Sequence, residues 1–154
     1  MAGARRREVI YWGTLTRQEE QMATSLPAAV RELLDGKNFA HVATLMRDGS
    51  PQVTAVWIDV DGDRILVNTA EGRTKPANVR RDPRVAISIV DQENPYRAAF
   101  IRGRVVDLVH EGAGEHIDKL SEKYWGRKYA HRPGEQRVIL VIESDHVRGM
   151  GLAL

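Results

Sequence analysis

Residues 68–84 carry a high concentration of groups that could bind an anion. The run reads NTAEGRTKPANVRRDPR and follows DRILV, a segment typical of a strand. Where this strand should end and a short helix should begin, the chain places Arg73, Thr74, Lys75 and Asn78. Free N–H groups at a helix start, hydroxyl groups and cationic side chains all bind phosphate. The run therefore predicts either a phosphate site or an ordinary solvated helix start with surface arginines.

A second candidate set lies on the segment PQVTAVWIDV. In a strand its alternate side chains share a face, so one face carries Gln52, Thr54 and Val56, and the other carries Val53, Ala55 and Trp57. The ordinary interpretation places the polar face in solvent and the apolar face in the core. The alternative is a ligand-lining face, because a flat heterocycle is held by amide groups and backbone N–H groups along its edge.

Other catalytic chemistries have little support in this sequence. The five histidines are scattered, and only His110 and His116 stand near each other, without convincing metal-ligand spacing. There is no cysteine, so a thiolate nucleophile or thiolate metal site is excluded. We find no G-x-S-x-G turn, no carboxylate pair at a strand end, and no glycine motif of the Walker or Rossmann kind. We therefore expect no metal site and no hydrolytic machinery.

Composition indicates one globular domain. The 154 residues are 42% hydrophobic and 29% charged, with a net charge of +2. Arginines cluster at positions 5–7, but no apolar segment of a secretory signal follows them, and no run reaches the ~18 apolar residues of a membrane span. We expect a cytoplasmic protein that binds neither membrane nor nucleic acid, since the arginines occur without interleaved aromatics or a known module.

The elements that must position these residues can be outlined from turn residues and periodicity. Residues 1–24 are expected to form a flexible N-terminal extension, and 25–154 the folded domain. We predict helices at 25–37, 74–82 and 111–126, and strands at 38–46, 51–60, 63–70, 84–91, 97–109 and 136–151. Asp48-Gly49 and Asp61-Gly62 predict tight turns, and therefore an antiparallel meander of the first three strands. Gly103 predicts a bulge in its strand. About six strands with few helices predict a mainly β fold, a small closed or split barrel.

The order of these motifs resembles the pyridoxamine 5'-phosphate oxidase-like split-barrel superfamily, and more narrowly its flavin/deazaflavin oxidoreductases that use coenzyme F420. The most specific pieces are DGSPQVT, the NTAEGRTKPANVRRDPR run, NPYR followed by a strand with RGRV, and the terminal VILVIES. The resemblance covers roughly residues 25–150. It implies a six-stranded split β-barrel (FMN-binding split barrel) with a few short helices, and a homodimer with cofactor sites at the subunit interface.

The resemblance also implies roles for individual residues. The positions that match Arg73, Thr74 and Lys75 bind the cofactor phosphate in relatives, and the position of Asn78 lies on the helix beside it. The ring and its ribityl chain are lined by positions that match Gln52, Thr54, Val56, Asn68 and Thr69. No catalytic side chain is implied.

The aromatic residues near the end of the domain have two interpretations. Tyr96, Tyr124, Trp125 and Tyr129 could pack in the core, which we expect for at least two of them. Tyr96, Tyr124 and Trp125 are also candidates to close the cofactor site from the second subunit.

The implied activity is hydride transfer from reduced coenzyme F420 (8-hydroxy-5-deazaflavin) to an unsaturated or heterocyclic small molecule. The alternatives are an FMN-dependent oxidase or flavin reductase, and a non-enzymatic binder of F420, FMN or haem. F420 and FMN share a ring–ribityl–phosphate layout, so the phosphate site does not separate them. F420 adds an anionic oligoglutamate tail, which would favour nearby cations such as Arg80, Arg81, Arg84, Arg127 and Lys128. A true vitamin B6 oxidase is less favoured, because the C-terminus lacks a recognisable substrate-phosphate segment.

Overall fold

The computed structural model describes residues 24–154. The predicted N-terminal extension lies outside these residues except for Thr24, and that residue belongs to the folded body. The Thr24 backbone N–H donates to the carbonyl of Ser144 at 2.6 Å, and its hydroxyl donates to the carbonyl of Asp145 at 2.8 Å. The predicted boundary after residue 24 stays a prediction, although Thr24 is already hydrogen-bonded to the last strand.

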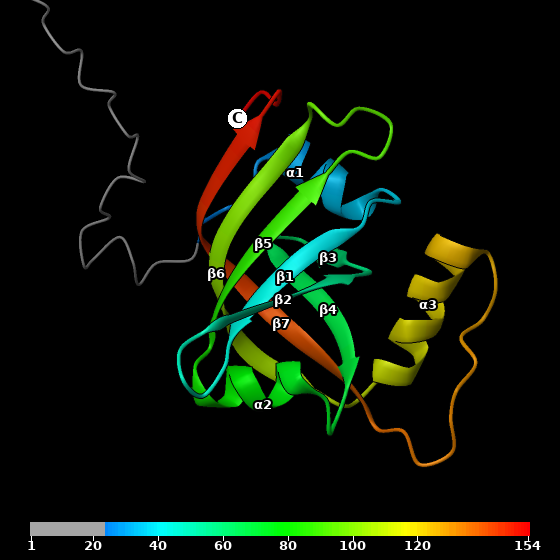
Figure 1. The fold of residues 1–154 in the computed structure, drawn as a ribbon. Coiled ribbons are helices and arrows are strands. Elements are labelled where there is room, and N and C mark those ends of the chain that lie inside the picture. Colours follow the sequence, from blue (N-terminus) through cyan, green and yellow to red (C-terminus); the bar gives the residue numbers. More distant parts are fainter. Residues whose placement is uncertain (1–23) are drawn as a thin grey trace, which may run out of the picture.

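Seven strands form one antiparallel sheet in the described part of the chain (Figure 1). Along the chain they are β1 (Ala40–Leu45), β2 (Pro51–Val56), β3 (Asp59–Asp61), β4 (Arg64–Ala70), β5 (Arg84–Val90), β6 (Ala98–Val109) and β7 (Arg137–Met150). Their order across the sheet is β2-β1-β5-β6-β7-β4-β3. The sequence predicted six strands; the structure has one more because the predicted strand 51–60 breaks at Trp57 and Ile58 into β2 and β3.

The predicted three-stranded meander is confirmed in part: both turns join antiparallel pairs, β1 with β2 and β3 with β4, but its middle strand is broken into β2 and β3. β1 and β2 do form the predicted hairpin, but β4 pairs with β3 and β7 instead of β2. Ile58 is fully buried and Asp59 almost so, which indicates that the chain turns inward here to bury an apolar side chain.

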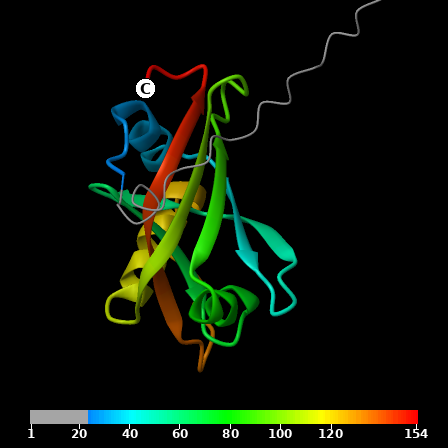
Figure 2. The same ribbon diagram turned by 90° about the vertical axis from the view of Figure 1, so that its left-hand side faces the viewer.

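The same break joins the two edges of the sheet. β2 and β3 are the edge strands, and only Trp57 and Ile58 separate them in the chain. The sheet must therefore curl until its edges approach at this corner, as Figures 1 and 2 show. No ladder joins β2 to β3 among the strands described, so complete closure of the barrel stays a prediction.

The bulge predicted at Gly103 is confirmed. The pairing of β6 with β7 shifts register between Arg102 and Gly103. A Cβ atom on Gly103 would lie 2.2 Å from the carbonyl oxygen of Glu143, so only glycine permits this close approach of the two strands.

The described part of the chain has three helices, and Figures 1 and 2 show where they lie around the curled sheet. They are α1 (Ala28–Asp35), α2 (Thr74–Arg81) and α3 (Ala113–Trp125), each within the predicted range. α1 buries Val30, Leu33 and Leu34 in the main core, together with inward-facing strand residues such as Ile87 and Leu140. α2 lies at the opposite end of the sheet, and α3 packs along its side against β4 and β7. The corner between α2, α3 and β4 positions the candidate site.

Candidate cofactor-binding site

A cavity of about 260 Å³ lies where β2 and β4 meet the start of α2 and the inner face of α3. Its lining includes five of the predicted cofactor residues: Val56, Asn68, Thr69, Arg73 and Lys75. The aromatic side chains of Phe39, Trp57 and Tyr129 line it as well. The cavity therefore combines cations with flat apolar surface.

Lys75 lies in the first turn of α2 and reaches across to β2. Its ammonium group donates to the hydroxyl oxygen of Thr54 at 2.7 Å. No carboxylate among residues 24–154 forms an ion pair with it. Burial, and then the charge of Arg73, lower the pKa of Lys75 below its ordinary value. An anion in the cavity would supply the missing counter-charge.

Arg73 and Thr74 form the junction between β4 and α2. Arg73 is the N-cap residue in an extended conformation, and its side chain makes no capping hydrogen bond. Its guanidinium lies 3.5 Å from the Glu135 carboxylate and is half exposed. Thr74 is exposed at the first helical position, where backbone N–H groups have no partner within the helix. The predicted helix start beside Arg73 is confirmed, and the binding of phosphate by Arg73, Thr74 and Lys75 stays a prediction.

The polar face of β2 points inward, which contradicts the ordinary interpretation of this strand. Gln52, Thr54 and Val56 are half-buried, whereas Val53 on the opposite face is 61% exposed. Of these three residues only Val56 lines the cavity, together with Ala55 of the opposite face, so the ligand-lining role of Gln52 and Thr54 stays a prediction.

Buried polar atoms without a partner mark the same region. Among the described residues, four buried side-chain atoms have no hydrogen-bond partner, and two of them, Gln52 Oε1 and Thr69 Oγ1, belong to the predicted site. Thr69 is only 2% exposed and lines the cavity. Because an unsatisfied buried polar atom costs roughly 1–3 kcal/mol, such atoms are expected where a ligand completes the hydrogen bonds.

Asn78 and Tyr124, two further predicted residues, serve the packing of this chain. Asn78 is 2% exposed; its amide donates to Thr44 Oγ1 at 3.0 Å and accepts from Arg81 at 2.7 Å. Tyr124 is 3% exposed, and its hydroxyl donates to the carbonyl of Asn38 at 2.6 Å. Neither residue lines the cavity, and the polar groups of both are engaged within this chain, so we do not include them in the proposed site.

Tyr96 and Trp125 are exposed, at 77% and 57%. Tyr96 lies in the turn between β5 and β6 and does not line the cavity. Trp125 packs edge-on against the cavity residue Trp57, with ring centroids 4.6 Å apart. Their predicted contact with a partner's cofactor stays a prediction.

Arg137 is a cavity residue that the sequence analysis missed. It begins β7 and is 8% exposed, and its guanidinium carbon lies 5.1 Å from the centre of the Tyr129 ring. Its Nη1 donates to Glu135 at 2.8 Å and its Nε to Asn68 at 2.8 Å. Its position directly before the apolar run VILVI could have marked Arg137 as a site candidate. A charged side chain at the start of a buried strand is either exposed to solvent or held by a partner.

Two of the arginines considered for the anionic tail pair with a nearby carboxylate. Arg80 pairs with Glu71 at 2.5 Å and Arg84 with Asp82 at 2.7 Å. Arg81 donates to Asn78 Oδ1. The ion pairs of Arg80 and Arg84 reduce the positive charge available for the anionic tail considered above.

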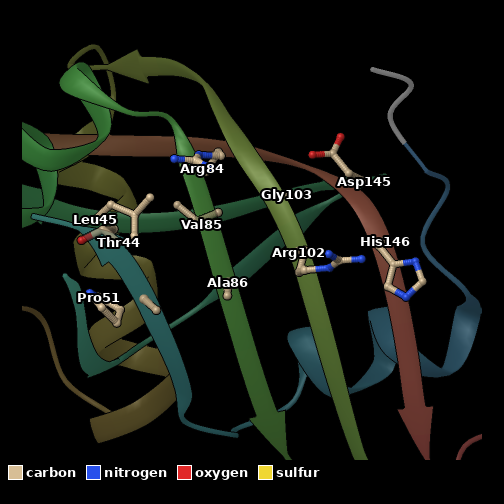
Figure 3. Close-up of a pocket in the computed structure, with 11 residues that line it drawn as sticks. Thr44, Leu45, Pro51, Arg84, Val85, Ala86, Arg102, Gly103, Asp145 and His146 are labelled. Atoms are coloured by element: carbon tan, nitrogen blue, oxygen red, sulfur yellow. The ribbon is translucent and has the colours of Figure 1, made fainter. Parts of the chain in front are cut away.

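A second cavity, of about 480 Å³, lies across β1, β5, β6 and β7 (Figure 3). None of the predicted site residues lines it; its lining includes Ala86, Arg102 and His146. An adjoining apolar hollow on β1, β2, β5 and β6 is lined by Val53 and Phe100 among others. This sheet face therefore exposes apolar surface apart from the candidate site.

Two further features, a metal-binding cluster and a membrane-spanning helix, are not found in the described region. Within residues 24–154, no three His, Asp or Glu side chains gather as a metal site would require. None of the three helices in that range has the length and apolar run needed to cross a bilayer.

Comparison with known proteins assigns this arrangement to a family. The family model for pyridoxamine 5'-phosphate oxidase matches residues 26–151. A solved structure described as an F420 reductase is 33% identical, with 80% of this chain and 98% of that chain covered and a TM-score of 0.72. A conserved hypothetical protein from Mycobacterium tuberculosis shares the fold at 24% identity, over 92% of this chain and 95% of that chain, with a TM-score of 0.68. A structure described as a putative pyridoxamine 5'-phosphate oxidase from Listeria innocua shares it at 19% identity, over 74% and 89%, with a TM-score of 0.58.

Proposed function

Because this chain belongs to the pyridoxamine 5'-phosphate oxidase family, we propose that it is an oxidoreductase whose cavity binds the phosphate of coenzyme F420. The observation that carries the proposal is Lys75, a partly buried cation without a carboxylate partner in residues 24–154, beside Arg73 and Arg137 in one cavity. F420 is preferred to FMN because the similar structure at 33% identity is described as an F420 reductase.

The residues of the cavity fit such a cofactor. Lys75 and Arg73 neutralise the phosphate together with the free N–H groups at the start of α2. The Thr69 hydroxyl on β4 lines the cavity and has unused hydrogen-bonding capacity, as has the Gln52 amide oxygen on β2 outside the lining, and Trp57 and Tyr129 offer flat apolar surface to a ring. The bound deazaflavin would supply the hydride, and the protein would hold the ring and admit an unsaturated or heterocyclic small molecule.

The proposed assembly is a homodimer that completes the cavity. Complete ligand sites usually enclose roughly 300–1,000 Å³, and the cavity of one chain is smaller at about 260 Å³. Ala55 shares the face of Val53 on β2 and lines the cavity, so a second copy packed on this exposed apolar face would border the cavity.

Equilibrium titration with F420 and, separately, with FMN tests this function through the fluorescence of each cofactor. We expect F420 to bind in the low micromolar range and FMN more weakly. Tighter binding of FMN would replace the proposal with an FMN-dependent oxidase or flavin reductase. Binding of neither cofactor would refute it.

A further inference from the structure

Asn68 links the candidate cavity to a buried polar network on its far side. Its amide nitrogen donates to the carbonyl of Ala113 at 2.8 Å and lies 3.1 Å from His116 Nδ1. Its amide oxygen accepts from Arg137 Nε at 2.8 Å. Because a carbonyl only accepts and a guanidinium only donates, these partners fix which end of the amide is which.

The same reasoning fixes the tautomer of His116. Its Nε2 lies 3.0 Å from a carboxylate oxygen of Asp59, whose side chain is 4% exposed. Burial alone would raise the pKa of Asp59, but hydrogen bonds from His116 and Lys119 outweigh it and hold that pKa far below its ordinary value. The ionised carboxylate can only accept, so Nε2 carries the proton. Nδ1 is left with the lone pair that accepts from Asn68.

We propose that His116 is a positioning residue for Arg137. Its Nδ1 lone pair holds the Asn68 amide, and that amide in turn holds the guanidinium at the cavity wall. The inference rests on the proposed function, because it gives Arg137 the task of meeting the cofactor anion.

The geometry explains why this positioning matters. Arg137 uses its Nε–H on Asn68 and one Nη1–H on Glu135. The second Nη1–H and both Nη2–H groups are the ones available to an anion. An arginine held in one rotamer before the ligand arrives loses less entropy on binding. Asp59 and His116 therefore act on the cavity from β3 and α3 without lining it.

Two substitutions at position 116 separate positioning from simple packing. Asparagine places its Oδ1 near the site of the imidazole Nδ1 and preserves the acceptor for Asn68. Phenylalanine preserves the ring size and removes the acceptor. Both variants lose the hydrogen bond to Asp59. A difference in affinity between them therefore reports the acceptor for Asn68 and not the bond to Asp59.

The probe is FMN, which carries the phosphate and is fluorescent, titrated against the full chain. We expect His116→Asn to bind within about twofold of the wild type, and His116→Phe to bind about five- to tenfold more weakly, as for loss of one hydrogen bond. Equal affinities of the two variants, whether tight or weak, would overturn the proposal.

Nitrogen-15 NMR of the histidine rings tests the same network without relying on a variant's stability. The His116 resonances are assigned by their absence in His116→Asn, and the proposal requires a protonated Nε2 and a bare Nδ1. A proton on Nδ1 would overturn it.

The NMR measurement also separates this inference from the proposed function. If the wild type binds neither FMN nor F420, the function fails. The network is then judged by the tautomer and by the Arg137 Nε–H signal. That signal should be protected from exchange in the wild type and in His116→Asn but not in His116→Phe; equal protection in both variants would contradict the network.

Discussion

The ammonium group of Lys75 and the hydroxyl of Thr54 lie 2.7 Å apart, and this contact joins the first turn of α2 to the inward face of β2. The contact satisfies one donor of Lys75 but leaves its charge without a carboxylate anywhere in residues 24–154. Burial and the neighbouring Arg73 both oppose that charge. The ligand-free protein therefore holds an unfavourable cation at the place where we propose a phosphate.

Replacement of this cation should separate stability from binding. In Lys75→Met, we expect the free energy of unfolding of the ligand-free protein to stay within about 1 kcal/mol of wild type or to rise, because loss of the Thr54 hydrogen bond is offset by removal of a desolvated charge. Cofactor affinity should fall by roughly 1.5–3 kcal/mol, the range of a charge-assisted hydrogen bond. Urea unfolding and fluorescence titration measure the two quantities.

The exposed Lys37 provides the matched control, as Lys37→Met should change neither quantity. If Lys75→Met unfolds more readily and binds F420 as the wild type does, Lys75 is structural.

Glu71 should give stability that is lost in acid. Hydrogen bonds from Arg80 and then His110 lower the pKa of Glu71 to about 2. A folded-state pKa below the unfolded value means that this stabilisation is fully present above about pH 4.5 and disappears as the pH falls towards 2.

The urea midpoint of Glu71→Gln measured against pH checks this. The variant should be less stable than the wild type at pH 7, by a small amount because the pair is partly solvated, and the two should converge near pH 2. A difference that does not change with pH would exclude the ion pair as its cause.

Gly103 should be irreplaceable, since an added Cβ would collide with the backbone carbonyl of Glu143 at 2.2 Å. We expect Gly103→Ala to cost about 2–4 kcal/mol of unfolding free energy, through displacement of β6 from β7. Gly114→Ala is the control: its Cβ would meet only His131 at 3.9 Å, and it should stabilise α3 by about 0.5–1 kcal/mol. Equal effects of the two substitutions in thermal or urea unfolding would show that the bulge tolerates a side chain.

Val53 tests the proposed homodimer. It is 61% exposed on β2, facing away from Thr54 and beside an apolar hollow of the sheet. Val53→Lys should shift the protein towards monomer in sedimentation equilibrium and weaken F420 binding, because the second copy completes the cavity. Ser50→Lys, in the turn of the same hairpin, should do neither. A wild type that is monomeric at all concentrations would contradict the dimer directly.

Local sequence patterns predicted the parts of this protein that depend on neighbouring residues. Asp48-Gly49 marks the β1–β2 hairpin, Gly103 the bulge, and Arg73 with Lys75 the junction that reaches the cavity. Each depends on turn chemistry or on the change from strand to helix within a few residues.

The parts that were missed depend on tertiary packing. β4 pairs with β7, about 70 residues away, and the predicted strand 51–60 breaks at Trp57 and Ile58; no local pattern marks either feature. Arg137 lines the cavity and donates a hydrogen bond to Asn68, which lies 69 residues earlier in the chain. Asn78 had the expected position on α2 but turns inward to Thr44, which only the packed structure reveals.

The most direct test of the phosphate site compares FMN with riboflavin, which has the same ring and ribityl chain but no phosphate. If Arg73, Lys75 and Arg137 hold the phosphate, the wild type should bind FMN at least about tenfold more tightly than riboflavin. In Lys75→Met this preference should fall towards one, with the riboflavin affinity unchanged. Equal affinity of the wild type for the two ligands, or an unchanged preference in Lys75→Met, would contradict the account.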